Sequence, residues 1–549
     1  MPKSRTNAIR ILTVLLAAAA LFMGAACPGP QPGPSFKHVI VFIGDGMSVE
    51  SEIAASRYLY GRDRGLAWHS FPGKSYVATW DVTAYNLNAK EAGRDAYSAS
   101  AFAPSLGYDV RREGSRPYPD EGFRGAAEPV SAPATDSASA ATALATGTKT
   151  DSGNVSWRPG DSPGGALATI AEDFRAARKG AIGVVSTVPF SHATPAAFVS
   201  HNTSRGHYYT GCRGYTGLGI ADEIILQVKP EVVIGAGDPL FDNPSFDTKK
   251  GYISESLYRA LQTSTEYVLA ERKVGADGSR TLNEAADQAL AQGKKLFGLY
   301  GGPDENFVHP VAENSPGSPR FRSVCPEDPT LKDATLAALR VLGRNPNGFF
   351  LMVEQGDIDW ANHDNDFRRM IATMADLDAA VRAAVAFVDE PGDDIDWTNT
   401  VLLVTADHAT GGLRLNPSKP LGAGALPRQF PRPKPGAEGG SEEAETVPKA
   451  TSASRRAAPK SPFIYPDGEV SYSTIGHSNE LVTLAVSGPA ARLFLVYQGS
   501  WYPGPIVDNT QVNAAMREAL GLGTVETGSP VANDNVTAAP GSPGRAARK

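Results

Sequence analysis

The sequence has few cysteines, no internal repeat and no basic stripe. Its formal net charge is −7, and because no lysine and arginine stripe is present to neutralise phosphates, we expect no nucleic-acid partner. This mild acidity does not exclude a small anionic substrate held by local charge and metal ions. The 549 residues have an ordinary globular composition, which fits either several domains or one large α/β domain with insertions.

The first of the three cysteines, Cys27, ends a segment that has the features of an export signal. Residues 1–27 begin with basic residues, continue with an apolar stretch too short for a stable membrane anchor, and end in small residues, which predicts a signal peptide. The end of this segment resembles a bacterial lipoprotein box, although Gly24 replaces the usual leucine. Two outcomes stay open: Cys27 is lipidated and anchors the chain, or the protein is released into the periplasm.

The part of the chain that follows the signal peptide would lie where disulfides are permitted. Whether Cys212 and Cys325 pair depends on their geometry, which the sequence does not give. Residues 28–35 are rich in proline and glycine and predict an extended tether between the membrane and the folded domain.

Apolar runs alternate with helical patterns along residues 36–523. This alternation predicts an α/β fold, a three-layer sandwich in which helices cover both faces of a central, mainly parallel sheet. The expected strands are 36–43, 181–187, 231–235, 295–300, 347–353, 400–406 and 481–487, and the expected helices are 166–179, 330–342 and 367–388.

Three stretches depart from this alternation. Residues 83–134 and 414–470 are rich in glycine and proline and predict surface insertions in the domain of residues 36–523. Residues 524–549 predict a disordered tail.

Carboxylates and imidazoles follow three of the expected strands. Asp45 follows the first, Asp407 and His408 follow the run 400–406, and Glu354, Asp359 and His363 follow the run 347–353. Open α/β sheets bind ligands at the carboxyl ends of their strands, and unpaired buried charge is costly. These side chains therefore predict a metal site, whereas a single Asp-His pair would also fit a polar turn.

An alanine-rich run, residues 134–143, favours a helix, and Ser137 lies at its expected start. Ser137 is either the N-cap of this helix or a nucleophile whose phosphorylated form faces the helix N-terminus. Farther along, Pro195 suits the start of another helix, and Arg205 follows about three helical turns later. Arg205 is either a solvated cation at a helix end or a planar fork that binds two phosphate oxygens.

Seven short motifs occur in order between about residues 36 and 490. They are Gly44 to Met47, Thr135 to Ala140, His192 to Pro195, Thr203 to Arg205, Glu354 with Asp359 and His363, Thr405 to His408, and Gly476 to Ser478. Together they resemble the signatures of the alkaline phosphatase family, and a set of spaced motifs in family order is far more specific than any one of them.

The resemblance implies a phosphomonoesterase with a catalytic serine, two zinc ions and one magnesium ion. Ser137 would be the phosphorylated nucleophile and Arg205 the residue that clamps the phosphate. The implied metal ligands are Asp359, His363 and His477 for one zinc, Asp45, Asp407 and His408 for the other, and Asp45, Thr194 and Glu354 for magnesium.

The donor types agree with this assignment, since imidazole and carboxylate suit zinc and an all-oxygen set suits magnesium. Two metals roughly 4 Å apart can stabilise both the attacking and the leaving oxygen. His192 stands where the enterobacterial form has Asp, and Trp360 stands where it has Lys. This combination is similar to several marine and cold-adapted bacterial enzymes, and we expect both side chains near the third metal without ligating it.

Three other functions fit the sequence less well. A phosphodiesterase of the same superfamily is the nearest, but Arg205 and the third metal set favour a monoester. A sulfatase would need a Cys/Ser-x-Pro-x-Arg context, which is absent around Ser137. A non-catalytic phosphate- or metal-binding lipoprotein would not need both Ser137 and every ligand. We also expect small phosphomonoester substrates and allow for a homodimer; the remaining histidines, His38, His69, His201, His207 and His309, are expected to be structural or on the surface.

Overall fold

The computed structural model describes residues 36–109, 133–209, 211–212, 217–240, 251–301, 306–322, 325–432 and 461–524. The predicted signal peptide with Cys27 and the tether lie outside the described residues. So do residues 110–132 of the first insertion, 433–460 of the second, and the tail from residue 525. None of the described helices is both long and apolar enough to cross a membrane.

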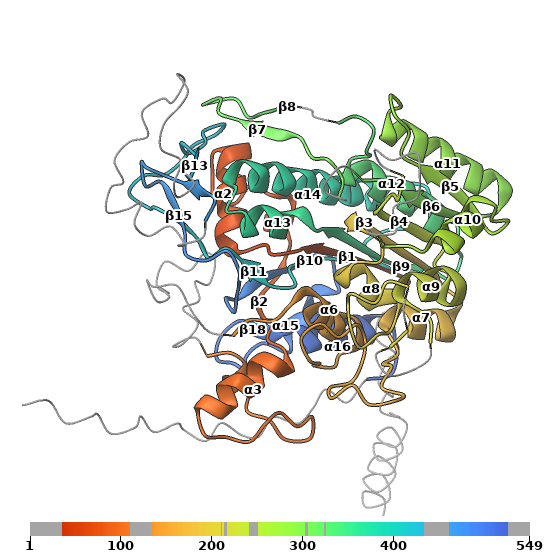
Figure 1. Ribbon diagram of the computed structural model, residues 1–549, viewed down its shortest axis with the longest axis horizontal. Coiled ribbons are helices and arrows are strands. Elements are labelled where there is room, and N and C mark those ends of the chain that lie inside the picture. The colour runs from red at the N-terminus through yellow and green to blue at the C-terminus, as the bar shows by residue number, and fades with distance from the viewer. Residues whose placement is uncertain are drawn as a thin grey trace, which may run out of the picture. The chain divides into compact units, whose positions relative to one another are not determined.

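A ten-stranded sheet forms the middle layer of the described residues (Figure 1). In the order of the sheet, the strands are β18 (Ile506–Asp508), β2 (Gly73–Ala78), β17 (Val482–Val486), β10 (Thr400–Thr405), β1 (His38–Gly44), β9 (Phe349–Gln355), β3 (Ala181–Pro189), β4 (Val232–Ala236), β6 (Lys295–Leu299) and β5 (Tyr267–Glu271). All neighbouring pairs are parallel except those that β17 makes with β10 and β2. The prediction of a mainly parallel sheet is therefore confirmed.

The central strands bury every residue, as apolar runs covered on both faces must. Ile43 of β1 lies beside Thr405 of β10 on one side and Glu354 of β9 on the other. This register brings the carboxyl ends of three strands together. The side chains that follow them in the sequence consequently meet at one edge of the sheet.

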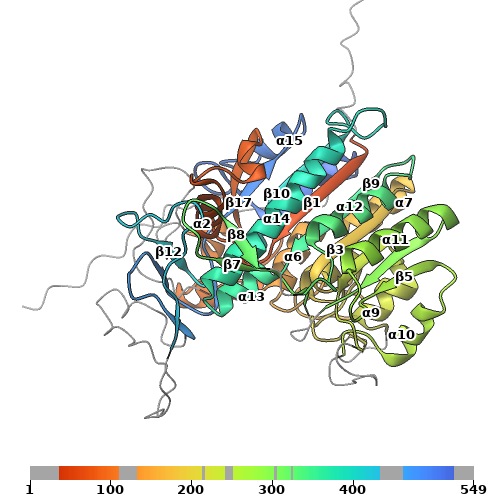
Figure 2. The same cartoon turned by 90° about the horizontal axis from the view of Figure 1, so that it is seen from above.

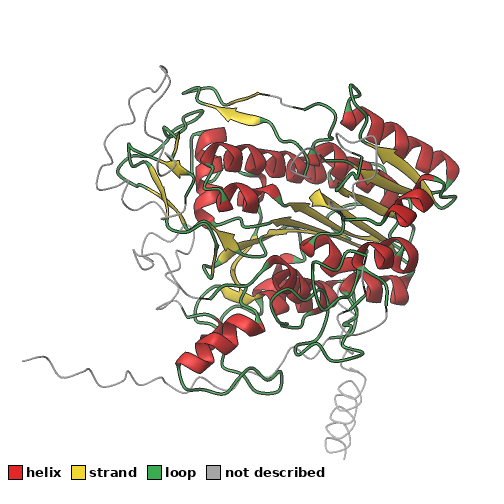
Figure 3. Ribbon diagram, in the orientation of Figure 1, coloured by secondary structure: helices red, strands yellow, loops and turns green. Residues whose placement is uncertain are grey.

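Helices cover both faces of the sheet, as Figures 1 and 3 show. One layer contains α2 (Val49–Tyr60), α11 (Gly278–Gln292), α12 (Leu331–Leu342), α13 (Asp357–His363) and α14 (Phe367–Val388). The other contains α6 (Ser137–Thr146), α7 (Ile170–Arg178), α8 (Ala193–Val199), α15 (Ala491–Leu495) and α16 (Asn509–Ala519). Seen from above, α14 and α12 lie over the sheet and run roughly along its strands (Figure 2). The three-layer prediction is confirmed.

The prediction that Arg205 lies at the end of a helix is wrong. Helix α8 ends at Val199, and Ser200 is extended, with φ −160° and ψ 172°. The chain leaves the helix because Asn202 forms an antiparallel bridge with Val155. Arg205 follows in a turn whose backbone N–H donates to Gly153 O.

Both insertions contain ordered parts. In the first, α3 (Val82–Glu91) and the short α4 (Pro104–Gly107) pack around an aromatic cluster that includes Trp80. In the second, β12 (Leu413–Leu415) pairs with β15 (Val470–Tyr472), and β13 (Phe430–Pro431) pairs with β14 (Phe463–Ile464), so the two ends of the insertion run side by side. Cys212 and Cys325 are free thiols.

Candidate active site and metal centre

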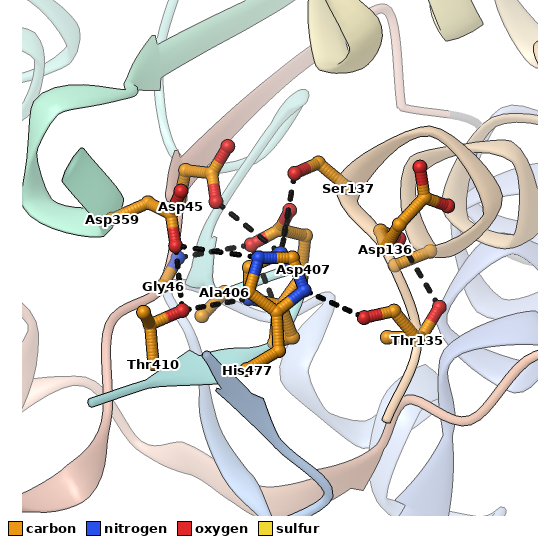
Figure 4. Close-up of polar contacts among 12 residues, drawn as sticks. Asp45, Gly46, Thr135, Asp136, Ser137, Asp359, Ala406, Asp407, Thr410 and His477 are labelled. Atoms are coloured by element: carbon orange, nitrogen blue, oxygen red, sulfur yellow. Dashed lines mark hydrogen bonds and ion pairs between the residues drawn. The ribbon is translucent and has the colours of Figure 1, made fainter. Parts of the chain in front are cut away.

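Ser137 is the first residue of α6, and Asp136 is the N-cap before it. The Oδ1 atom of Asp136 accepts a hydrogen bond from the Ser139 backbone N–H at 3.0 Å, as a capping carboxylate does. The N-cap of α6 is therefore Asp136 and not Ser137. Ser137 is buried, and its Oγ lies 3.2 Å from Nε2 of His408 (Figure 4).

The ends of β1 and β10 bring Asp45, Asp407 and His408 together. His408 Nε2 lies 3.5 Å from Asp45 Oδ1 and 3.3 Å from Asp407 Oδ2. The other oxygen of Asp407 accepts hydrogen bonds from the backbone N–H groups of Gly46 and His408, which fixes the carboxylate. All three predicted ligands thus converge, and Figure 4 shows Asp45 and Asp407 in the region of Ser137.

Asp359 and His363 share one face of α13, as their spacing predicts, and His477 approaches them from β16 (His477–Ser478). His363 Nε2 lies 3.2 Å from Asp359 Oδ2 and 3.1 Å from His477 Nε2. The opposite ring nitrogens contact backbone carbonyls, Ile475 O at 2.5 Å and Thr135 O at 2.7 Å. Both imidazoles therefore direct Nε2 at one point.

Asp359 connects the two clusters. Its ligand atoms lie within 4.8 Å of those of His363 and His477, and also within 4.8 Å of those of Asp45 and His408. Thr410 Oγ1 holds the carboxylate from behind by donating to Asp359 Oδ1 at 2.5 Å, and lies 3.3 Å from His408 Nδ1. Carboxylates and imidazoles at this spacing can hold two divalent ions.

A third group is made of oxygen atoms. Glu354 and Thr194 are completely buried, and Asp45 is nearly so. Glu354 Oε1 and Thr194 Oγ1 have no hydrogen-bond partner among the described residues, and Asp45 Oδ1 and Asp407 Oδ2 share a single neighbour, Nε2 of His408, at 3.5 and 3.3 Å. Ser186 donates to the other oxygen of Glu354 at 2.5 Å. Buried oxygen atoms without partners are costly unless a cation satisfies them, so this donor set fits a metal ion.

The pKa values of these carboxyl groups also favour a bound metal ion. Burial, and after it the neighbouring carboxylates, raises the pKa of Asp45 and of Asp407 well above the ordinary range. Burial also raises the pKa of Glu354 to about 7. For Asp359, burial is outweighed by the hydrogen bond from His363, so its pKa is lowered. Crowded carboxylates of this kind favour a bound cation.

The guanidinium of Arg205 is held by hydrogen bonds to two neighbouring side chains. Nη1 donates to Asp136 Oδ2 at 2.9 Å, and Nη2 donates to His192 Nε2 at 3.3 Å. A guanidinium cannot accept a hydrogen bond, so His192 Nε2 carries the lone pair and Nδ1 carries the proton. His192 Nδ1 is buried and has no partner among the described residues. Burial and the nearby guanidinium lower the pKa of His192 to about 3, which keeps this ring neutral.

A cavity of about 350 Å³ opens onto these groups. It is lined by Ser137, His192, Arg205, Asp359, Trp360, His363, Asp364 and His477. The cavity therefore combines the predicted nucleophile, the predicted phosphate clamp and one imidazole–carboxylate cluster. Trp360 lies beside His192, with ring centroids 6.3 Å apart, as expected for this pair.

Several residues of the site were not predicted. Asp136 holds Arg205, Thr410 holds Asp359, and Ser186 holds Glu354. Asp136 and Thr410 could have been suspected, because each lies within two residues of a predicted site residue. Ser186 lies in the middle of an apolar strand, where the sequence gives no such signal.

The five other described histidines do not line the cavity. His69 contacts Glu52, His201 bridges Glu172 and Glu223, His207 contacts Asn202, His309 contacts Asp357 and Asp376, and His38 packs on Phe349. These contacts agree with the structural roles expected for them.

Comparisons of this chain with a family model and with known proteins agree with one another. The family model described as "Alkaline phosphatase" matches residues 124–522. An alkaline phosphatase of Escherichia coli is 31% identical over 68% of this chain and 70% of its own length. Alkaline phosphatase 4 of Bacillus subtilis is 30% identical over 51% of this chain, and the match spans 50% of that relative's length.

A solved structure shows the same fold. It is a mutant of the alkaline phosphatase of the Antarctic bacterium TAB5, with His replaced by Asp and Mg bound in the M3 site. The similarity covers 89% of this chain and 99% of that one, with a TM-score of 0.53 and 20% identity.

Proposed function

This chain belongs to the alkaline phosphatase family, and we propose that it hydrolyses phosphate monoesters through a phosphoserine on Ser137 and releases inorganic phosphate. One observation carries the proposal. The Ser137 hydroxyl stands at the N-terminus of α6, 3.2 Å from the imidazole of His408 and in the same cavity as Arg205. A nucleophile, a metal centre and a phosphate-binding cation thus face one space.

The reaction has two displacement steps at phosphorus. Ser137 Oγ attacks, loses its proton and forms a bond to phosphorus, while the bond to the substrate alcohol breaks and the alcohol leaves with a proton. A water molecule then attacks the same phosphorus, the bond to Oγ breaks, and Ser137 regains its proton. Arg205 binds two phosphate oxygens in both steps, since a planar guanidinium matches their spacing. The free N–H groups at the start of α6 favour the added negative charge.

We propose two zinc ions and one magnesium ion. Asp359, His363 and His477 would hold one zinc, and Asp45, Asp407 and His408 the other. Zinc in these sets would lower the pKa of the attacking hydroxyl or water and neutralise charge on the leaving oxygen. The support is the mixture of imidazole and carboxylate donors in both clusters and the directed Nε2 atoms of His363 and His477.

Asp45, Thr194 and Glu354 would hold the magnesium, because their donors are all oxygen. The proton on His192 Nδ1 supports this choice, since a protonated nitrogen can donate to an oxygen ligand but cannot bind a metal. The mutant TAB5 structure, with Mg in its M3 site, is a precedent for magnesium in a related protein.

We also propose that the protein is exported and works in the periplasm or anchored to the cell envelope by a lipidated Cys27. The support is the charged start, apolar centre and small residues of residues 1–27. Fractionation of cells expressing the full chain and a Cys27→Ser variant tests this. Loss of the protein from the membrane fraction in the variant alone would indicate lipid anchoring, and a cytoplasmic wild type would contradict export.

The proposed activity is tested with zinc- and magnesium-reconstituted protein on p-nitrophenyl phosphate beside bis-p-nitrophenyl phosphate. The monoester should be strongly preferred, and Arg205→Ala should raise KM for it and weaken inhibition by free phosphate, because a bidentate contact is lost. Equal loss on both esters, or a preference for the diester, would favour the phosphodiesterase alternative. Zinc binding without phosphate release would favour a non-catalytic protein.

A further inference from the structure

Ser186 lies in β3 and faces Glu354 of the neighbouring strand β9. The two residues are partners in the parallel pairing of these strands, and both are completely buried. Ser186 Oγ donates to Glu354 Oε2 at 2.5 Å. Glu354 Oε1 has no hydrogen-bond partner among the described residues. The two oxygens of one carboxylate therefore have different surroundings.

The direction of the Ser186 hydroxyl is fixed from its other side. The backbone N–H of Val188 donates to Ser186 Oγ at 3.0 Å. Because a hydroxyl has one hydrogen and a carboxylate can only accept, Ser186 accepts from Val188 and donates to Glu354. The pairing of β3 with β4 is irregular between Val185 and Pro189, so the strand departs from regular pairing where this hydroxyl is held.

Glu354 Oε1 belongs to the third group of oxygen atoms, together with Thr194 and Asp45. None of these three residues lines the cavity onto which Ser137 opens. Glu354 lies on β9 and Asp45 directly follows β1, and these two strands pair in the middle of the sheet. The group therefore lies in a closely packed part of the fold, which limits how far its oxygens can move to suit a larger ion.

The size of a divalent ion decides how it uses a carboxylate. Magnesium requires near-octahedral ligands at roughly 2.0–2.1 Å, whereas calcium takes about six to eight oxygens at roughly 2.3–2.6 Å and can bind both oxygens of one carboxylate. A hydrogen bond to Glu354 Oε2 reduces the charge that this oxygen offers to a metal and restrains rotation of the carboxylate. Glu354 therefore offers Oε1 alone, which suits magnesium better than calcium.

We propose that Ser186 is a positioning residue that makes the third group select magnesium over calcium, because it limits Glu354 to one metal-binding oxygen. Ser186 itself binds no metal in this arrangement, since its hydroxyl is directed at Glu354. This inference rests on the proposed function, which assigns magnesium to Asp45, Thr194 and Glu354, and adds the residue that determines the choice of ion.

The test measures binding of Mg²⁺ and of Ca²⁺ to the zinc-reconstituted full chain by calorimetry, so it does not depend on turnover. The informative quantity is the Kd for calcium divided by the Kd for magnesium. Glu354→Gln is the blank that identifies the heat of the third group. In the wild type the ratio should be well above one.

Ser186→Ala should lower the ratio by about tenfold, the order expected when one hydrogen bond to a charged group is lost, because Oε2 is then free to bind calcium. Ser186→Thr keeps the hydroxyl and should keep the ratio. Ser186→Cys, whose thiol is a weak donor, should give an intermediate ratio and replaces the alanine variant if that does not fold. Crystals of Ser186→Ala with calcium should show both oxygens of Glu354 on the ion.

The matched control is Ser200→Ala. Ser200 is also completely buried, and its Oγ donates to the backbone oxygen of Ala196 at 2.9 Å. The change therefore removes a buried hydroxyl without altering the contact between Ser186 and Glu354, and it should leave the ratio unchanged.

The inference is overturned if Ser186→Ala has the wild-type ratio, or if Ser200→Ala lowers the ratio equally. Weaker binding of both ions in Ser186→Ala at a constant ratio also overturns it, since the hydroxyl would then only hold Glu354 in place. Failure of the proposed activity looks different, because the wild type would bind magnesium without hydrolysing p-nitrophenyl phosphate. A wild type that binds neither ion would contradict the magnesium assignment, and this inference with it.

Discussion

Asp136 accepts a hydrogen bond from Nη1 of Arg205 at 2.9 Å. The other oxygen of the same carboxylate caps α6 and accepts from the Gly153 backbone N–H at 3.0 Å. One side chain thus fixes the start of the helix that carries Ser137 and the direction of the guanidinium that would clamp the phosphate. Burial opposes its ionisation, but Arg205 and these hydrogen bonds prevail and lower the pKa of Asp136 to about 2, so it is charged at every working pH.

Asp136→Asn should separate the two roles. Asparagine caps helices about as well as aspartate, so the change in stability should be small, whereas the ion pair with Arg205 is lost. We expect weaker inhibition by free phosphate, by severalfold, since the guanidinium is no longer held in place. Asp136→Ala should show the same kinetic change and lose about 1 kcal/mol more in stability. If phosphate inhibits both variants as strongly as the wild type, Asp136 does not position Arg205.

Ser137→Ala should abolish formation of the phosphoenzyme and lower kcat by orders of magnitude, because covalent catalysis divides one difficult step into two. Helix α6 should stay intact, because Asp136 is its cap. Trapping with labelled phosphate at acid pH, together with zinc analysis, measures both points. Phosphate turnover near the wild-type rate in a variant that binds zinc normally would remove Ser137 from the mechanism.

Chelation should abolish activity, and the reconstituted protein should contain about two zinc ions per chain. His363→Ala and His408→Ala should each lower the zinc content, since each removes a nitrogen from one cluster. His207→Ala is the control, because its ring contacts Asn202 and does not line the cavity. Full zinc content in either ligand variant, measured by elemental analysis, would contradict the assignment.

His201 does not line the cavity and should make the stability of the fold depend on pH. Burial opposes its protonation, but hydrogen bonds to Glu172 and Glu223 prevail and raise its pKa to about 10, above the unfolded value of 6.5. The stabilisation is therefore fully present below about pH 6.5 and is lost as the pH rises through about 10.

Urea unfolding of wild type and His201→Gln at several pH values measures this loss. The difference in the free energy of unfolding should be a few kcal/mol at pH 6, on the order expected for a shift of this size, and should shrink toward pH 10. A difference that stays constant from pH 6 to pH 10 would mean that His201 contributes by packing and not by charge.

Much of the fold and of the candidate metal site could be predicted from the sequence because local and global signals agree. The apolar run 400–406 has to be buried, and a buried parallel strand delivers Asp407 and His408 at the ligand-binding edge of the sheet. Helices α12 and α14 end where they were predicted to end, because their apolar faces repeat with the helical period.

Other features depend on contacts between distant residues. Strand β2 was not predicted because it belongs to the sheet through pairing with β17 and β18, which lie some 400 residues later. The end of α8 depends on the bridge between Asn202 and Val155. For the same reason the pair of Asp136 with Arg205, 69 residues apart, could not be derived from either segment alone.

His192 should influence which ion the third group of oxygen atoms binds. Arg205 donates to Nε2 of His192, so the proton lies on Nδ1 and the ring offers a donor, not a lone pair, toward its surroundings. His192→Asp replaces this neutral donor with a negative charge two residues before Thr194. We expect magnesium to bind more tightly to this variant, and the benefit of added magnesium in the assay to become smaller.

Magnesium titration by calorimetry after zinc reconstitution measures the effect, and His192→Asn is the control because it removes the ring without adding charge. Nitrogen NMR of the wild type gives an independent reading: Nε2 of His192 should be unprotonated and Nδ1 protonated. If the Asp variant needs more magnesium than the wild type, or loses zinc with no gain in magnesium, His192 is itself a metal ligand. In that case its nitrogen, not an oxygen of Asp45, Thr194 or Glu354, decides which ion the third group selects.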